Sequence, residues 1–145
     1  MIRKMEFDDI AAVAQILLAD SSEIPWTENA LATYLMREDA ILLVLEKDGE
    51  VIGFAGVLLL IPEAEILDIT IRKANQGQGY GRLLFEELLI EAGEAGCRTV
   101  YLEVRKSNEA ARGLYHSCGF EDFGVRKNYY TDPAEDAYVM KFQGA

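Results

Sequence analysis

Gln76-Gly77-Gln78-Gly79-Tyr80-Gly81-Arg82 is a glycine-rich stretch between a predicted strand, residues 65–71, and a predicted long helix, about residues 81–95. Glycines at alternate positions let backbone N–H groups turn inward around an anion, and a helix N-terminus adds partial positive charge. The stretch therefore predicts a diphosphate cradle, and a glycine-rich turn without a ligand is the alternative. A Walker A loop needs Gly-Lys-Ser/Thr and a dinucleotide fingerprint needs G-x-G-x-x-G directly after its strand, so neither motif fits.

Six predicted elements lie on the N-terminal side of this stretch. A short strand near residues 2–5 is followed by an amphipathic helix that begins after Asp8-Asp9, and by a second helix that Thr27 can cap. Residues 41–46 and 51–61 form a predicted hairpin, because Asp48-Gly49 favours the positive φ angles of a tight turn. Residues 65–71 alternate, with Leu67, Ile69 and Ile71 on one face and Ile66, Asp68 and Thr70 on the other. The prolines Pro25, Pro62 and Pro133 are expected in loops.

The elements on the C-terminal side complete an α+β pattern. Residues 99–104 predict a strand, and Ser107 or Asn108 is expected to cap a helix that ends at a left-handed Gly119. Residues 120–126 and 136–142 are predicted strands joined by a loop that holds Tyr129-Tyr130. The order of about seven strands and four helices predicts one domain over residues 1–145. Its sheet is expected to be mixed, twisted and mostly antiparallel, with a right-handed βαβ crossover in the middle.

Two side chains are candidates for acid–base chemistry beside the predicted cradle. Glu103 alternates with apolar neighbours on a strand expected to be central, where it can be a general base toward an amine or lie on a solvated strand face. Tyr115 lies on the apolar stripe of its helix, which favours a core tyrosine, but a phenol is also a suitable proton donor to a thiolate leaving group. His116 points off that stripe and lacks a triad partner, so we expect it at the surface.

Composition excludes several classes of protein. The 145 residues carry a net charge of −11, and a uniformly acidic surface repels nucleic-acid phosphates and anionic lipid while remaining compatible with a cationic substrate. Cys97 and Cys118 are too far apart for a CxxC pair, and one histidine cannot complete a metal site with them, so we expect free thiols and no metal. The N-terminus lacks a long apolar region, and the longest apolar run, residues 51–61, is about half a membrane span. The chain is therefore predicted to be cytoplasmic.

Over essentially its whole length, the sequence resembles the GCN5-related N-acetyltransferase (GNAT) superfamily. Gln76-x-x-Gly79-x-Gly81 followed by Arg82 is similar to the acetyl-CoA diphosphate loop of that superfamily. Asn108-x-x-Ala111-x-x-Leu114-Tyr115-x-x-x-Gly119-Phe120 is similar to its second cofactor and catalytic segment. Within the superfamily the chain most resembles the bacterial ribosomal-protein-alanine N-acetyltransferases, the RimI-like group, at residues 25–28, 102–105, 126–130 and 135–140.

The resemblance implies a GNAT fold and direct acetyl transfer from acetyl-CoA to a protein N-terminal amine, with a basic ribosomal protein as the acceptor. Glu103 matches the general base of the family and Tyr115 its general acid. Residues implied to bind the cofactor are Ile69, Thr70, Ile71, Gly77, Gln78, Gly79, Tyr80, Gly81, Arg82 and Asn108, and those implied to flank the acceptor peptide are Trp26, Tyr129 and Tyr130. Arg72 and Lys73 join Arg82 as the cations expected near the phosphates. No metal is required, and a monomer is expected.

Two other functions remain open at this point. The first is acetyl transfer to a lysine side chain or a small amine, although the predicted Tyr129-Tyr130 loop argues against a wide acceptor pocket. The second is a catalytically silent acyl-CoA-binding regulator, which is expected to have lost the acid and the base. Glu103 and Tyr115 are both present, which disfavours the regulator.

Overall fold

Seven strands form one mixed sheet in the computed structural model, which describes residues 1–21, 26–131 and 133–144. The strands are β1 (Ile2–Lys4), β2 (Ala40–Lys47), β3 (Glu50–Leu60), β4 (Glu63–Ile71), β5 (Thr99–Arg105), β6 (Glu121–Thr131) and β7 (Ala134–Gln143), in the spatial order β1-β2-β3-β4-β5-β7-β6. Neighbouring strands are antiparallel except β4 and β5, which are parallel and connected through helix α3 (Tyr80–Glu94). The predicted mixed, mostly antiparallel sheet is confirmed.

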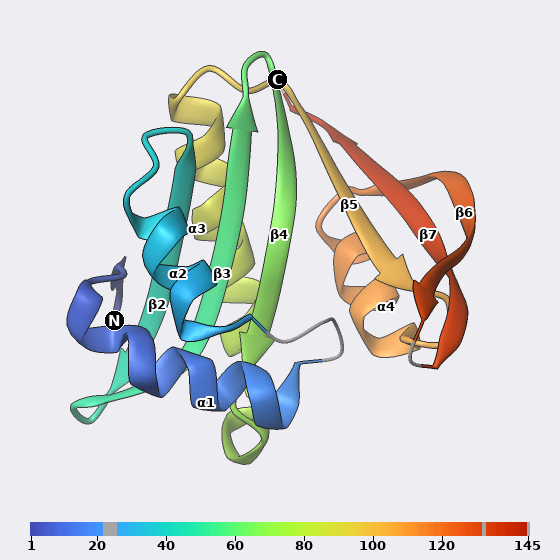
Figure 1. Cartoon of the computed structure of the whole chain (residues 1–145). Helices are drawn as coiled ribbons and strands as arrows, with labels where there is room; N and C mark the ends of the chain where they lie inside the picture. The colour runs from blue at the N-terminus through green and yellow to red at the C-terminus, as the bar shows by residue number, and fades with distance from the viewer. Residues whose placement is uncertain (22–25, 132, 145) are drawn as a thin grey trace.

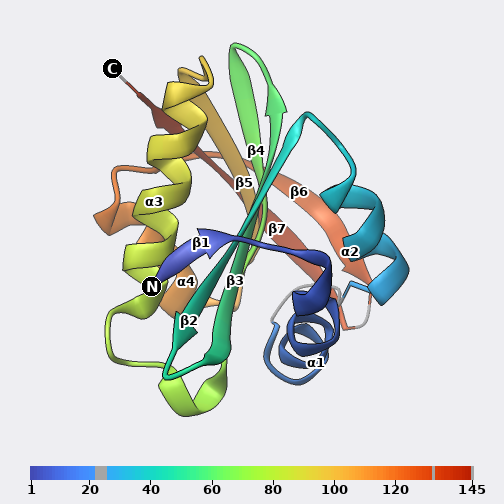
Figure 2. The same ribbon diagram turned by 90° about the vertical axis from the view of Figure 1, so that its left-hand side faces the viewer.

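The four α-helices of the described residues cover the two faces of the sheet in pairs (Figure 1, Figure 2). Helices α1 (Ile10–Asp20) and α2 (Glu28–Leu35) lie on one face, and α3 and α4 (Glu109–Ser117) lie on the other. Strand β2 shows why both faces are apolar: Leu42 and Val44 pack in the core under α1 and α2, whereas Leu43 and Leu45 pack in the core under α3. None of the helices in the described part of the chain is long and apolar enough to cross a membrane.

Local sequence signals mark the boundaries of these elements, at a hairpin turn and at the N-termini of two helices. Asp48 (φ +52°) and Gly49 (φ +80°) form the turn between β2 and β3. Thr27 Oγ1 accepts a hydrogen bond from Ala30 N at 3.1 Å and caps α2. Asn108, rather than Ser107, caps α4, because its Oδ1 accepts a hydrogen bond from Ala111 N at 3.1 Å.

Strands β4 and β5 pair only at their N-terminal ends, where Glu63–Glu65 lie opposite Thr99–Tyr101. The two strands then separate (Figure 1), so the edge of β4 that faces β5 has no strand partner over residues 66–71 in the described structure. Backbone N–H and C=O groups need hydrogen-bond partners. This edge of β4 is therefore a place where a ligand can pair with the backbone.

A β-bulge in β4 overturns the predicted alternation of this strand. Residue 56 of β3 pairs with Asp68, but residue 57 pairs with Ile66, so Leu67 is the extra residue. Ile66 therefore packs with Ile71 in the α3-side core and does not share a face with Asp68. The pattern of residue types does not show the bulge, because a bulge is defined by pairing with the neighbouring strand.

The prediction that Tyr129-Tyr130 lie in a loop is also wrong. Strand β6 continues through Thr131, since Tyr130 pairs with Glu135 and Thr131 pairs with Ala134 of β7. A register shift between Arg126 and Tyr130 lets the hairpin continue past an irregular stretch that looks like a loop in the sequence.

Several smaller predictions can also be checked. Cys97 is a buried free thiol and Cys118 a half-buried one. His116 is exposed, and its Nε2 lies 3.0 Å from Asp122 Oδ1. Pro62 and Pro133 lie in turns, as expected, whereas Pro25 lies outside the described residues.

Candidate active site

A cavity of about 400 Å³, here called the β4 cavity, lies along the unpaired edge of β4 and under the glycine-rich loop. Its walls come from the end of α1, β4, the loop before α3, the first turn of α3, and α4. The lining residues are Asp20, Ile69, Thr70, Ile71, Asn75, Gln76, Gly77, Gly79, Tyr80, Gly81, Asn108, Ala110, Ala111, Leu114 and Tyr115. The divergence of two parallel strands thus produces a cavity that ends at a helix N-terminus.

The glycine-rich loop needs its glycines for backbone conformation. Gly77 (φ +78°) and Gly79 (φ +85°) are both in the left-handed region, and Gly79 is the residue directly before α3. A Cβ at either position would meet no atom within 4 Å, so the loop surface beside the cavity is open. Gln76 Nε2 donates a hydrogen bond to Ile71 O at 2.9 Å and holds the loop against the end of β4. These features fit an anion held by backbone N–H groups at a helix N-terminus.

Most residues expected to bind the cofactor line this one cavity. They come from three separate parts of the chain, namely Ile69, Thr70 and Ile71 of β4, Gly77, Gly79, Tyr80 and Gly81 of the loop and α3, and Asn108 before α4. The residues that the sequence grouped by motif are therefore also grouped in space.

Gln78 and Arg82 do not line the β4 cavity. Arg82 points from the first turn of α3 to the end of α4, where its Nη1 donates to Ser117 Oγ at 2.7 Å and its Nη2 to Ser117 O at 3.3 Å. A cation is stabilised at the C-terminus of a helix, where backbone carbonyl groups are unpaired. Arg82 therefore connects the two helices that flank the cavity.

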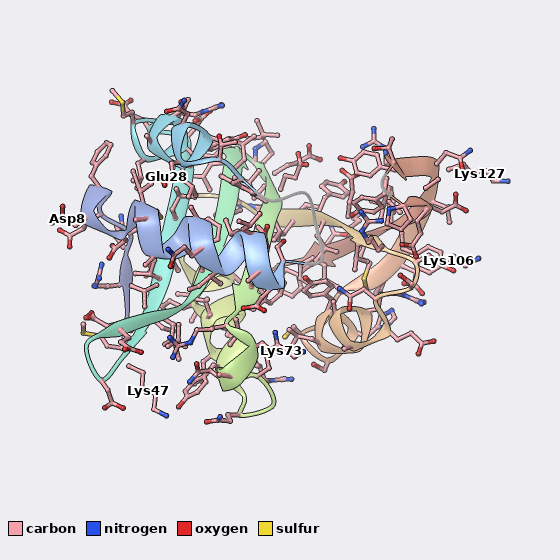
Figure 3. All side chains as sticks on the ribbon, turned by 60° about the horizontal axis from the view of Figure 1, so that its bottom comes forward. Asp8, Glu28, Lys47, Lys73, Lys106 and Lys127 are labelled. Carbon is pink, nitrogen blue, oxygen red and sulfur yellow. The ribbon has the colours of Figure 1, made fainter. Side chains whose placement is uncertain are left out.

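The other two cations expected near the phosphates also lie outside the cavity lining. Arg72 Nη1 pairs with Glu50 Oε2 at 3.2 Å, and Figure 3 shows Lys73 on the turn that precedes the glycine-rich loop. Neither residue lines the β4 cavity in the described structure. The cradle consequently offers backbone N–H groups more than basic side chains.

Sequence reasoning missed Asp20 and Asn75, which line the cavity. Asp20 is the last residue of α1, and its Oδ2 accepts a hydrogen bond from the backbone N–H of Lys73 at 3.1 Å. Asp20 and Lys73 are 53 positions apart, so only packing of α1 on the sheet brings them together. No motif or periodicity signals such a contact.

Tyr115 is both a core residue and a cavity residue. Its side chain is 8% exposed, and its ring centroid lies 5.1 Å from that of Phe85 of α3. The same side chain lines the β4 cavity beside Ile69 and Thr70. The two interpretations of Tyr115 offered by the sequence are therefore compatible.

A second cavity of about 230 Å³, here called the Trp26 cavity, lies next to the first along β4. It is lined by Trp26, Glu65, Ile66, Leu67, Glu103, Tyr129 and Tyr130. All three aromatic residues expected at the acceptor site are thus together with Glu103. Trp26 also packs against Tyr34, with ring centroids 4.9 Å apart, so it serves the core as well as the cavity.

The carboxylate of Glu103 is held by an ion pair. Arg126 Nη1 donates to Glu103 Oε2 at 2.9 Å, and the Arg126 guanidinium lies 5.0 Å from the ring centroid of Tyr129. Partial burial and the nearby Glu103 carboxylate raise the pKa of Tyr129. Burial and the Glu103 charge likewise raise the pKa of Glu65. The lining of the Trp26 cavity therefore contains two carboxylates, Glu65 and Glu103, and Arg126 is paired with the second of them.

Asp68 is a buried carboxylate, which the sequence analysis assigned to a face of its strand without giving it any role. It is 4% exposed, and its two oxygens accept hydrogen bonds from Thr70 Oγ1 at 2.7 Å and Ser21 Oγ at 3.3 Å. Burial raises the pKa of Asp68 to about 6, against the opposing effect of these hydrogen bonds. Asp68 thereby connects β4 to the end of α1, between the two cavities.

Comparison with known proteins agrees with this geometry. Residues 10–120 match the family model described as Acetyltransferase (GNAT) family. The ribosomal protein bS18-alanine N-acetyltransferase of Escherichia coli strain K12 is 36% identical over 141 residues, which are 96% of this chain and 94% of that protein. The crystal structure of the ribosomal-protein-S18-alanine N-acetyltransferase from Escherichia coli superimposes with a TM-score of 0.89 and 35% identity, over 99% of this chain and 92% of that one. The structure of yncA from Salmonella typhimurium with its cofactor acetyl-CoA has a TM-score of 0.84 and 26% identity, over 99% and 92% of the two chains. The chain belongs to the GNAT acetyltransferase family.

Proposed function

We propose that this chain is an acetyl-CoA-dependent N-α-acetyltransferase whose acceptor is the N-terminal amine of a ribosomal protein. The observation that carries the proposal is the presence of two adjacent cavities on β4, one containing Tyr115 and the other containing Glu103. Adjacent stretches of the same strand, residues 66–67 and 69–71, line the two cavities. A donor and an acceptor bound in the two cavities meet at β4. The name of the 36% identical Escherichia coli relative supports an N-terminal alanine as the acceptor.

The β4 cavity suits acetyl-CoA because its two ends match the diphosphate and the pantetheine arm of that molecule. The N-terminus of α3 and the glycine-rich loop offer N–H groups to the diphosphate. The edge of β4 at residues 69–71 offers backbone groups to the amides of the pantetheine arm and to the thioester carbonyl. Acetyl-CoA supplies an activated thioester when it is bound.

Each catalytic role belongs to one side chain. Glu103 accepts a proton from the α-ammonium of the acceptor, directly or through a water, and the free amine attacks the thioester carbonyl. As the carbon–sulfur bond breaks, Tyr115 donates its hydroxyl proton to the departing thiolate sulfur. The proton that the attacking nitrogen loses as the amide forms restores the tyrosine hydroxyl. Because Arg126 already donates to Glu103, the acceptor ammonium has to share or replace that hydrogen bond.

Acetyl transfer to peptides of one sequence with a free or a chemically blocked N-terminus tests the proposal, with mass spectrometry locating the acetyl group. Both peptides contain one internal lysine. We expect acetylation of the α-amine of the free peptide and no modification of the blocked one.

Equal rates on the two peptides, with the acetyl group on the lysine, would refute the proposal in favour of a lysine acetyltransferase. Binding of acetyl-CoA without transfer to any amine would refute it in favour of a silent acyl-CoA-binding regulator. Isothermal titration with CoA separates this second outcome from loss of the fold.

A further inference from the structure

Asp68 lies at the boundary between the two cavities. On β4, residues 66 and 67 line the Trp26 cavity and residues 69–71 line the β4 cavity, so Asp68 is the residue between them. Helix α1 packs across β3 and β4 on the side of the sheet that the Asp68 carboxylate faces (Figure 1). The residue opposite Asp68 on β3 is Gly56, which has no side chain to pair with it. The acid–base steps of the transfer use Glu103 and Tyr115 and leave this buried carboxylate without a role.

The stability of the fold does not account for the charge of Asp68. Burial is the largest influence on its pKa, and the opposing influences are two hydroxyl groups and the Ile69 N–H, without any charged side chain of the described residues. At neutral pH, above its pKa of about 6, the buried carboxylate therefore makes the folded state less stable than the protonated acid would. Buried carboxylates with a shifted pKa concentrate at functional sites.

Asp68 orients the hydroxyl group of Thr70. An ionised carboxylate only accepts hydrogen bonds, so the 2.7 Å contact between Thr70 Oγ1 and Asp68 Oδ1 uses the hydroxyl proton of Thr70. Thr70 lines the β4 cavity beside Ile69 and Tyr115. Toward a ligand in that cavity, the Thr70 oxygen can then only accept a hydrogen bond. The amide N–H groups of a pantetheine arm are donors of the required kind.

The second oxygen of Asp68 holds the end of α1. Ser21 is the residue directly after this helix, and its Oγ donates a hydrogen bond to Asp68 Oδ2 at 3.3 Å. Asp20, which precedes Ser21, lines the β4 cavity, and Trp26, further along the chain, lines the Trp26 cavity. Asp68 therefore fixes a point of the chain that lies between one residue of each cavity.

We propose that Asp68 is a positioning residue of the acetyl-transfer reaction, whose carboxylate sets Thr70 as a hydrogen-bond acceptor for the pantetheine arm and holds the end of α1 beside the acceptor site. The inference rests on the proposed function and adds to it a residue that acts through two others. Asp68 itself is not among the lining residues of either cavity.

Two hydroxyl deletions separate the two hydrogen bonds of Asp68. Steady-state kinetics with acetyl-CoA and a peptide that has a free N-terminal alanine give a KM for each substrate. Thr70→Val is expected to raise KM for acetyl-CoA about fivefold and to leave KM for the peptide unchanged, and Ser21→Ala is expected to do the reverse. Thr33→Val removes an exposed hydroxyl of α2 that donates to Asn29 O, and as the matched control it should change neither KM.

Asp68→Ala removes both hydrogen bonds at once. We expect KM for both substrates to rise about fivefold, and adding Thr70→Val or Ser21→Ala should then raise either KM less than about twofold, because both changes act through one hydrogen bond. Asp68→Asn keeps an oxygen for the closer hydroxyl, Thr70, and should return KM for acetyl-CoA to within about twofold of the wild-type value. The single hydroxyl deletions decide the proposal even if Asp68→Ala does not fold.

Three results would overturn the inference. Acetylation of the peptide α-amine with KM values that Thr70→Val and Ser21→Ala leave unchanged, or raise together, would remove the role of Asp68 and leave the proposed function intact. Fully additive effects in the Asp68→Ala background would do the same. No acetylation of any α-amine would overturn the proposed function and the acceptor half of the inference. Calorimetry with CoA would then decide the cofactor half, which requires Thr70→Val to weaken binding about fivefold and is wrong if the affinity is unchanged.

Discussion

Replacing Asp68 by asparagine is expected to change how the stability of the protein depends on pH. Asp68 is 4% exposed and accepts hydrogen bonds from Thr70 and Ser21. Burial is the largest influence on it and raises its pKa from 3.8 to about 6. Asparagine has nearly the same shape and keeps an acceptor oxygen, but it has no charge to bury.

The direction follows from the two pKa values. Between the unfolded value of 3.8 and the folded value of about 6, the folded protein keeps a proton that the unfolded chain has released. The contribution of Asp68 to stability is therefore fully present below the unfolded pKa and is lost as the pH rises through the folded pKa. One pKa unit corresponds to about 1.4 kcal/mol, so the loss amounts to about 3 kcal/mol.

Urea unfolding at several pH values between about 4 and 8 measures this effect. The free energy of unfolding of Asp68→Asn minus that of the wild type is expected to increase by about 2.5 kcal/mol across this range, because pH 4 already lies at the unfolded pKa. The comparison is made between pH values, so any effect of the asparagine amide on stability that does not depend on pH cancels. Asp8→Asn, the same substitution at an exposed aspartate labelled in Figure 3, is the surface control. A constant difference for Asp68→Asn, or one that falls with pH, would refute the reasoning.

Three further predictions concern the site and the core. Glu103→Gln should lower kcat at least about 100-fold with little change in KM for acetyl-CoA, measured by CoA release, and an unchanged kcat would contradict the role of general base. Gly79→Ala places an alanine at φ +85°, which costs about 1–2 kcal/mol, and should weaken CoA binding in calorimetry. Gly81→Ala, whose new Cβ would lie 3.7 Å from its nearest neighbour, should fold with ordinary stability in thermal unfolding. Arg3→Met leaves the buried carboxylate of Asp9 without its ion pair and should cost about 2 kcal/mol at neutral pH. That loss of stability should become smaller as the pH falls through the lowered pKa of Asp9, because the carboxylate is then protonated. Urea unfolding at several pH values measures it. A loss that does not change with pH would show that the ion pair does not stabilise the protein.

The local structure around the site shows where prediction from sequence succeeds. Gly79 and Asn108 were placed correctly because the signals they give act within a few residues: a positive φ angle before a helix, and a side chain that caps the helix it precedes. Glu103 and Tyr115 were singled out by their places in a strand and on a helix stripe. The sequence does not show that they line separate cavities, because that depends on how far β4 and β5 diverge.

The failures have a common physical cause. Residues 65–71 were expected to alternate strictly, but pairing of β4 with β3 makes Leu67 an extra residue. Tyr129 was expected in a loop, but pairing with β7 extends the strand through it. In each case a contact between distant segments outweighs the local preference.

The sequence by itself determined the order of the elements, their caps and turns, and the glycine-rich loop before α3. These features depend on backbone angles and on hydrogen bonds between neighbours in the chain. Only the tertiary structure decided the bulge at Leu67, the burial of Asp68 and the two cavities along β4. These features depend on pairing and packing between segments that lie far apart in sequence. The free energy of such contacts belongs to both segments together, so it cannot be inferred from either segment alone.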